Sequence, residues 1–148
     1  MNDAPQEWRR GALLVTTDRA KIDLDALLAF MHTVHWTAST TREILARAVE
    51  ESIVFQVLDG AQIVGLTRVV TDRATYGYLT DVIVGESRRG QGIGKWLVGC
   101  VLEHRDLQQL RRLTLLTGEA PWLYEKFGFT LGSGKSVYME IKGPLKKQ

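Results

Sequence analysis

Residues 81–96 read DVIVGESRRGQGIGKW: an apolar run, a loop with three alternating glycines, and the first residues of an amphipathic pattern. This succession predicts a buried strand that leads through a glycine-rich loop into a helix. The first amides of a helix have no partner inside it, and the helix dipole favours an anion at that end. Glycines let a phosphate approach the backbone without meeting a Cβ atom. The stretch therefore predicts a diphosphate-binding loop, to which Arg89 and Lys95 add positive charge.

Two better-known phosphate loops do not fit the same residues. A Walker A loop requires Ser or Thr after its Gly-Lys pair, but Trp96 stands there. A Rossmann fingerprint requires two residues between its second and third glycines, but Gly90, Gly92 and Gly94 are each separated by one. A plain strand–helix turn would need fewer glycines, which favours phosphate binding over a purely structural turn.

Outward from the loop, apolar periodicity predicts the other elements. Strands are expected over residues 12–17, 53–58, 63–70, 76–84, 113–117, 129–131 and 137–140, and helices over 23–34, 40–49, 92–104 and 121–128. The order β-α-α-β-β-β-α-β-α-β-β predicts an α/β fold, with a mixed sheet of six or seven strands and helices on both faces. No linker divides the chain, so one domain is expected over residues 1–148.

Local signals refine two of these elements. Asp59-Gly60 between two apolar runs predicts a hairpin with a type I′ turn, which needs positive φ at both central residues. Thr40 and Glu43 match a capping box at the start of the second helix.

Composition narrows the class of protein. The 19 Lys and Arg against 17 Asp and Glu leave a formal charge of +2, too weak a field to favour nucleic acid. No apolar run approaches the roughly 20 residues that cross a bilayer, and the N-terminus lacks the features of a signal peptide. The single cysteine, Cys100, lies in an apolar helical pattern, so we expect a buried thiol and no cysteine-based metal cluster. We expect a cytoplasmic protein with no metal, membrane or nucleic-acid partner.

Two motifs together resemble those of the GNAT acyltransferases. Arg89-x-x-Gly92-x-Gly94 follows an apolar strand, and Leu123-Tyr124-x-x-x-Gly128-Phe129 begins a later short helix. The order of elements is also similar, so the resemblance covers nearly the whole chain. It implies a GNAT fold and the use of acetyl-CoA as co-substrate, without a metal.

The resemblance also implies which residues bind coenzyme A. The diphosphate would lie on the loop and helix start formed by Arg89, Gly90, Gln91, Gly92, Ile93, Gly94 and Lys95. In the family, the strand before this loop splays from its neighbour, and pantetheine fills the gap as an added strand. Val82, Ile83 and Val84 stand in that strand here. Thr117 occupies the position at which many relatives carry an asparagine that contacts the coenzyme.

Catalytic roles follow from the same resemblance. Tyr124 aligns with the tyrosine that, in many members, protonates the leaving thiolate; otherwise it is a core aromatic. Asp81, an acid inside an apolar strand, is the best local candidate for the general base, or else a partner in an ion pair. His35, Trp36 and Tyr78 are candidates for binding the acceptor.

The implied function is transfer of an acetyl group to a primary amine of a small-molecule or peptide acceptor, by direct nucleophilic attack. The alternative is a non-catalytic sensor or partner domain that binds acyl-CoA on the same loop. The identity of the acceptor stays open, because one fold serves many acceptors. Dimers are common in the family, so a homodimer is one expectation.

Overall fold

The computed structural model describes residues 4–132 and 134–145, so Met1, Asn2 and Asp3 of the N-terminal segment lie outside the described residues. The chain divides into two compact units, one ending at Leu116 and the other beginning at Thr117. The expectation of one domain over residues 1–148 stays a prediction.

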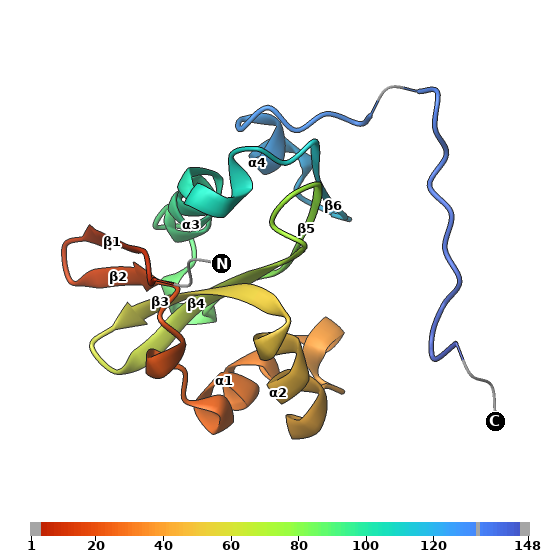
Figure 1. Ribbon diagram of the computed structural model, residues 1–148. Coiled ribbons are helices and arrows are strands. Elements are labelled where there is room, and N and C mark those ends of the chain that lie inside the picture. The colour runs from red at the N-terminus through yellow and green to blue at the C-terminus, as the bar shows by residue number, and fades with distance from the viewer. Residues whose placement is uncertain (1–3, 133, 146–148) are drawn as a thin grey trace. The chain divides into compact units, whose positions relative to one another are not determined.

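A six-stranded mixed sheet forms the centre of the first unit (Figure 1). The strands follow the chain in the order β1 to β6, and only β5 and β6 pair in parallel. Their bounds are Glu7–Arg10 (β1), Leu13–Thr16 (β2), Ser52–Asp59 (β3), Gln62–Thr71 (β4), Tyr76–Val84 (β5) and Arg112–Leu115 (β6). The mixed sheet expected from the sequence is confirmed, but β1 is a strand that the apolar pattern does not predict.

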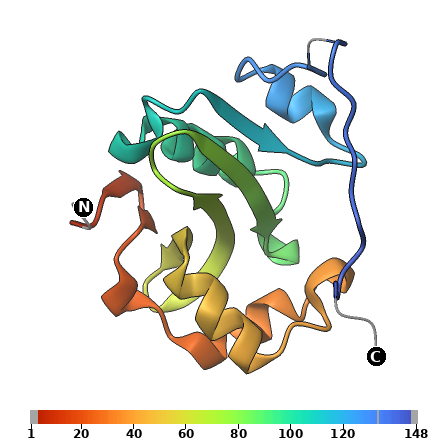
Figure 2. The same cartoon turned by 45° about the vertical axis from the view of Figure 1, so that its right-hand side comes forward.

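Helices cover both faces of this sheet (Figures 1 and 2). Helices α1 (Leu24–Met31) and α2 (Arg42–Glu50) lie on one face, and α3 (Ile93–Glu103) lies on the other. Short 3₁₀ helices occur at Arg19–Lys21, His35–Thr37, Glu86–Arg88 and Arg105–Leu107. The expectation of helices on both faces is confirmed.

The core on the α1–α2 side joins these helices to three strands. Its buried members are Leu27, Met31, Val34, Leu45, Val54, Leu66 and Ile83. Asp23 caps α1 by accepting a hydrogen bond from the amide of Ala26 at 3.1 Å. At α2 the cap is Thr41, which accepts from the amide of Ile44 at 3.2 Å. The helix starts one residue later than a capping box on Thr40 requires.

On the opposite face, α3 buries Ile93, Leu97, Val98, Cys100 and Val101 against β3, β4 and β5. Cys100 is only 2% exposed, and burial, together with the nearby Glu103 carboxylate, raises the pKa of its thiol to about 12. The buried thiol expected from the sequence is confirmed.

The β1–β2 and β3–β4 hairpins each have a two-residue turn with the sequence Gly-Ala. Asp59 pairs with Gln62, so the central turn residues are Gly60 and Ala61. Of the two, only Gly60 has a positive φ, +60°. One positive φ at the first central position is typical of a type II′ turn, so the type I′ turn expected at Asp59-Gly60 is wrong. Gly11 makes the equivalent turn between β1 and β2, with a φ of +58°.

The second unit contains α4 (Pro121–Glu125), with proline in its first turn, as the sequence predicts. The strands expected at 129–131 and 137–140 are not formed. Leu131 is 98% exposed and Met139 is 87% exposed. A strand needs a neighbour for its amides and carbonyls, and no described residue pairs with these segments. The closing hairpin is therefore wrong for the described residues, although their composition is typical of strands.

Candidate active site

The free edge of β5 is the first feature of the site. Strand β6 pairs with β5 only from Tyr76 to Leu79, where Leu79 faces Leu115. Among the described residues, the rest of β5 up to Val84 has no partner on that edge, whereas its other edge pairs with β4. The backbone of residues 82–84 is therefore open to an added strand, in the place that the family resemblance gives to pantetheine.

A β-bulge interrupts β5 just before this open edge. Leu66 pairs with Ile83 and Arg68 pairs with Thr80, so Thr67 alone faces two residues of β5. The first of them, Asp81, has a φ of +54°, a left-handed conformation that aspartate adopts more readily than most side chains. A bulge of this kind re-aims the side chains around it and increases the local twist.

Asp81 is held by an arginine from the neighbouring strand. Arg68 Nε donates to Asp81 Oδ2 at 2.7 Å, and the two side chains are 18% and 12% exposed. Arg68 Nη1 also donates to Ser52 Oγ at 3.4 Å. The ion pair that the sequence leaves open as an alternative is therefore present. Sequence reasoning misses Arg68, although a charged residue on an otherwise apolar face of β4 is a usable signal.

The loop after β5 is fixed by its own contacts. Arg88 donates to the carboxylate of Asp59 at 2.5 Å and so ties the loop to the β3–β4 turn. Gly90 and Gly92 have φ values of +80° and +77°, which residues other than glycine rarely adopt. Arg88 thus has a structural role through its pair with Asp59. The positive φ values explain why glycine stands at two of the three glycine positions of the loop.

The start of α3 presents unpaired amides. The helix has no side-chain cap, and its first helical hydrogen bond runs from the amide of Trp96 to the carbonyl of Gly92 at 3.0 Å. Within the described part of the chain, the amides of residues 90–95 donate to no carbonyl or side chain. The end of β5 lies beside them, because a Cβ built on Gly94 would come within 3.6 Å of Val84 Cγ2. Arg89 joins the two elements by donating from Nε to the carbonyl of Val84 at 3.1 Å.

These features fit a diphosphate. Positive-φ glycines leave the backbone accessible, unpaired amides supply donors, and the helix dipole favours negative charge. Lys95 and the terminal nitrogens of Arg89 add positive charge at the same place. The structure thus brings together residues 82–84 and 89–95, which the sequence assigns to one site.

A groove of about 550 Å³ opens between α2 and β4, beside the Arg68–Asp81 pair. Its lining combines apolar and charged side chains, from Glu43, Ile44, Arg47, Ala48, Glu51, Arg68 and Val70. Tyr78 of β5 pairs with Val70 and so lies next to this groove. His35 and Trp36 are exposed, contact each other edge to face at 5.2 Å between ring centroids, and do not line it.

Two expected site residues belong to the second unit. Tyr124 is 8% exposed, and its ring meets that of Phe129 edge to face at 5.9 Å between centroids. Burial raises the pKa of the Tyr124 hydroxyl, which keeps the phenol protonated at neutral pH. Thr117 is exposed, and its hydroxyl accepts a hydrogen bond from the amide of Ala120 at 3.1 Å.

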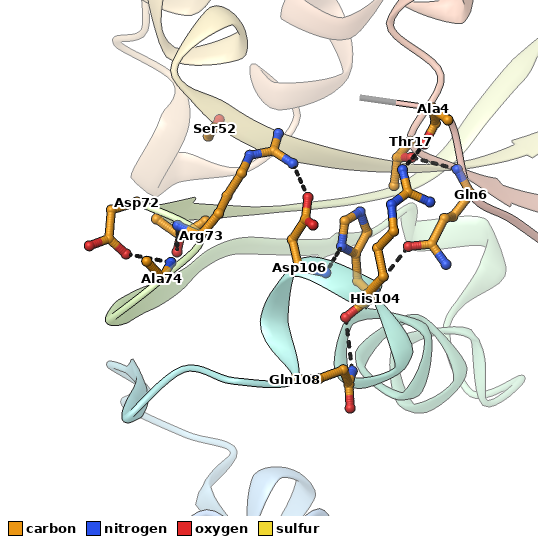
Figure 3. Close-up of polar contacts among 12 residues, drawn as sticks. Ala4, Gln6, Thr17, Ser52, Asp72, Arg73, Ala74, His104, Asp106 and Gln108 are labelled. Carbon is orange, nitrogen blue, oxygen red and sulfur yellow. Dashed lines mark hydrogen bonds and ion pairs between the residues drawn. The ribbon is translucent and has the colours of Figure 1, made fainter. Parts of the chain in front are cut away.

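A polar cluster surrounds the buried His104 elsewhere in the first unit (Figure 3). His104 Nδ1 accepts from the amide of Asp106 at 3.1 Å, and its carbonyl accepts from Gln108 Nε2 at 2.8 Å. Arg73 pairs with Asp106, which joins the turn before β5 to the segment after α3. These contacts connect neighbouring segments of the chain, so we interpret the cluster as structural.

Among the described residues, no group of three or more histidine, cysteine, aspartate or glutamate side chains could hold a metal ion. None of the helices that these residues form has the length and apolar character required to cross a bilayer.

The family model of the acetyltransferase (GNAT) domain matches residues 50–131, which include the open edge of β5, the glycine loop and Tyr124. The chain belongs to the GNAT acetyltransferase family. This GNAT protein is 32% identical to a Gibberella zeae protein named as an acetyltransferase, over 94% of this chain and 88% of the relative.

Solved GNAT structures have the same fold. An acetyltransferase of the GNAT family from Xanthomonas campestris is 33% identical, with a TM-score of 0.81 over 89% of this chain and 94% of that one. A GNAT family acetyltransferase from Streptococcus pneumoniae is 25% identical, with a TM-score of 0.71 over 90% of this chain and 98% of that one. The GNAT fold and the assignment as an N-acetyltransferase, both expected from the sequence, are confirmed.

Proposed function

We propose that this GNAT protein transfers the acetyl group of acetyl-CoA to a primary amine of a small-molecule or peptide acceptor. The observation that carries the proposal is the row of unpaired amides over residues 90–95, beside the open edge of residues 82–84. In the described chain the amides of residues 90–95 are unpaired, and the edge of residues 82–84 has no strand partner, although the carbonyl of Val84 accepts from Arg89 Nε. The chemistry of these groups matches a diphosphate followed by the amides of pantetheine.

In this proposal each segment binds one part of the donor. The amides of residues 90–95, with Arg89 and Lys95, bind the diphosphate. The backbone of Val82 and the amide of Val84 pair with pantetheine, which directs the thioester toward the bulge at Asp81. Thr117 is a further candidate for hydrogen bonding to the coenzyme.

The proposed chemistry is direct attack without a covalent enzyme intermediate. The amine nitrogen forms a bond to the acetyl carbon while the bond from that carbon to sulfur breaks. The proton that the amine loses goes to the carboxylate of Asp81, and the hydroxyl of Tyr124 supplies a proton to the leaving thiolate. The products are an amide and free coenzyme A, and proton exchange with solvent restores both side chains.

The groove between α2 and β4 is the proposed route for the acceptor. It borders the Arg68–Asp81 pair, so an amine that enters along it reaches the proposed base. Tyr78 would line its β5 side, and the exposed His35 and Trp36 would contact the more distant part of a larger acceptor.

A thiol-release screen tests the function. The protein is incubated with acetyl-CoA and a panel of polyamines, aminoglycosides, amino acids and peptides, and free coenzyme A is measured. We expect release that depends on one class of amine and an acetylated product of the matching mass. Binding of coenzyme A without release for any amine would contradict the catalytic proposal.

A further inference from the structure

Strand β1 brings an arginine to the start of α3. Trp8 and Arg10 are two residues apart on β1 and therefore share one face of the strand. Trp8 Nε1 donates to Glu103 Oε2 at 2.8 Å, near the C-terminal end of α3. The Arg10 guanidinium lies over the ring of Trp96, 4.8 Å from its centroid, near the N-terminal end. Strand β1 thus lies along α3, with Arg10 at the end that carries the unpaired amides.

The Arg10 guanidinium lies close to the glycine loop. A Cβ atom built on Gly92 would lie 3.8 Å from Nη1 of Arg10, and apart from the chain neighbours of Gly92 no other described atom comes within 4 Å of that position. Gly92 is the residue whose positive φ leads the loop into the helix. A guanidinium therefore flanks the place where the sequence predicts a diphosphate.

The charge of Arg10 is not neutralised within the described part of the chain. Arg68, Arg73 and Arg88 each form an ion pair with an aspartate, whereas Arg10 forms none. Arg10 Cζ lies over the indole, and among the described residues the N–H groups of Arg10 form no hydrogen bond to an acceptor. Such a preorganised cation suits a phosphate, which it can bind through two parallel hydrogen bonds.

We propose that Arg10 is a phosphate-binding residue of the coenzyme A site, and that Trp96 holds it in position. The inference rests on the proposed function. Coenzyme A carries phosphate both in its 5′-diphosphate and at its 3′ position, and a guanidinium recognises either in the same way. Titration with 3′-dephospho-coenzyme A, which lacks the 3′-phosphate, distinguishes the two positions.

Calorimetric titration of the full chain with coenzyme A tests the proposal through Arg10→Ala. The matched control is Arg9→Ala, because Arg9 is also exposed but lies on the other face of β1, where its charge acts on Glu7. Loss of a charge-assisted hydrogen bond predicts about a tenfold or greater weakening for Arg10→Ala. Arg9→Ala should stay within about twofold of the unchanged protein, since only long-range charge is lost.

Titration with 3′-dephospho-coenzyme A identifies the phosphate. If Arg10→Ala weakens both ligands equally, Arg10 binds the diphosphate. If it weakens only coenzyme A, Arg10 binds the 3′-phosphate. Equal effects of Arg9→Ala and Arg10→Ala on coenzyme A would overturn the proposal. Absence of coenzyme A binding by the unchanged protein would instead refute the proposed function itself.

The role of Trp96 needs a separate variant. As a single substitution, Trp96→Leu should weaken coenzyme A binding. When it is added to Arg10→Ala it should have little further effect, because the indole acts through the guanidinium. Thermal unfolding of each variant shows whether it is folded. Additive losses in the double variant would contradict the positioning role.

Discussion

Tyr124 is a buried phenol whose pKa is raised by burial, so it holds its proton at neutral pH. If it is the acid that serves the leaving thiolate, Tyr124→Phe should lower kcat about 100-fold, within the range usual for general acid catalysis. Affinity for coenzyme A should hardly change. Steady-state kinetics with the acceptor found by the thiol-release screen, together with calorimetry, measures both quantities.

Tyr138→Phe is the matched control, because it also removes one phenolic hydroxyl from the second unit but at an exposed position. It should keep full turnover. Full turnover in Tyr124→Phe would show that another group, or water, protonates the thiolate.

Asp81 raises a different question, because its ion pair with Arg68 gives it a structural role whether or not it is the base. Asp81→Asn and Arg68→Ala both break the pair, but only the first removes the carboxylate. We therefore expect similar losses of stability, of the order of 1–3 kcal/mol, and a much larger loss of kcat in Asp81→Asn. Equal losses of kcat in the two variants would indicate that Asp81 acts only through the pair.

At the residue scale, sequence reasoning identifies contacts made by neighbours in the chain. Arg89 to Lys95 form one continuous segment, so the motif that names them also places them together. Arg68 and Arg10 reach the site from other strands, and their contribution depends on sheet register and on the course of β1. Neither property is encoded within one local pattern.

At the scale of elements, the loop before α3 depends on backbone that only glycine adopts easily. Gly92→Ala should destabilise the fold by about 1–2 kcal/mol, because its φ of +77° is unfavourable for alanine. It should also weaken coenzyme A binding, because a relaxed φ turns the amides away from a common point. Urea unfolding and calorimetry measure the two effects.

Gly118→Ala is a suitable control, since Gly118 has no positive φ and open space around its Cβ position. We expect little change in stability or affinity. If Gly92→Ala bound coenzyme A as tightly as Gly118→Ala does, the conformation of the loop would not be what creates the site.

Sequence patterns predict most of the strands and helices correctly and fail at two places. Strands β2 to β6 and the four α-helices are predicted because each carries an apolar face that a core must bury. The apolar pattern does not predict strand β1, because its sequence, Glu7-Trp8-Arg9-Arg10, has only one apolar residue. The strand lies at the edge of the sheet. The expected closing hairpin fails for the opposite reason. Val137 and Tyr138 favour extended backbone, but propensity cannot supply a neighbouring strand.

At the scale of the whole molecule, stability should depend on pH through His104. Burial, followed by the charges of Arg105 and Arg73, lowers the pKa of this imidazole, while Asp106 opposes the shift. The unfolded chain binds a proton near pH 6.5, whereas the folded chain does not. The free energy of unfolding should therefore fall as the pH falls from about 6.5 toward the lower folded pKa, by at most about 1.4 kcal/mol per pH unit.

Urea unfolding at several pH values measures this slope. His104→Gln should flatten it, although the variant is less stable at neutral pH. His32→Gln should leave it unchanged, because His32 is exposed and bonds only to the carbonyl of Thr40. An unchanged slope in His104→Gln would assign the pH dependence to other groups.

The proposed function depends above all on binding of the coenzyme A diphosphate by the amides between β5 and α3. Thermal unfolding with and without coenzyme A, calibrated by calorimetry, tests it most directly. We expect saturable binding and a stabilisation of about 2.7 kcal/mol at a ligand concentration a hundred times the Kd. No heat of binding and no shift in Tm at millimolar coenzyme A or acetyl-CoA would contradict it.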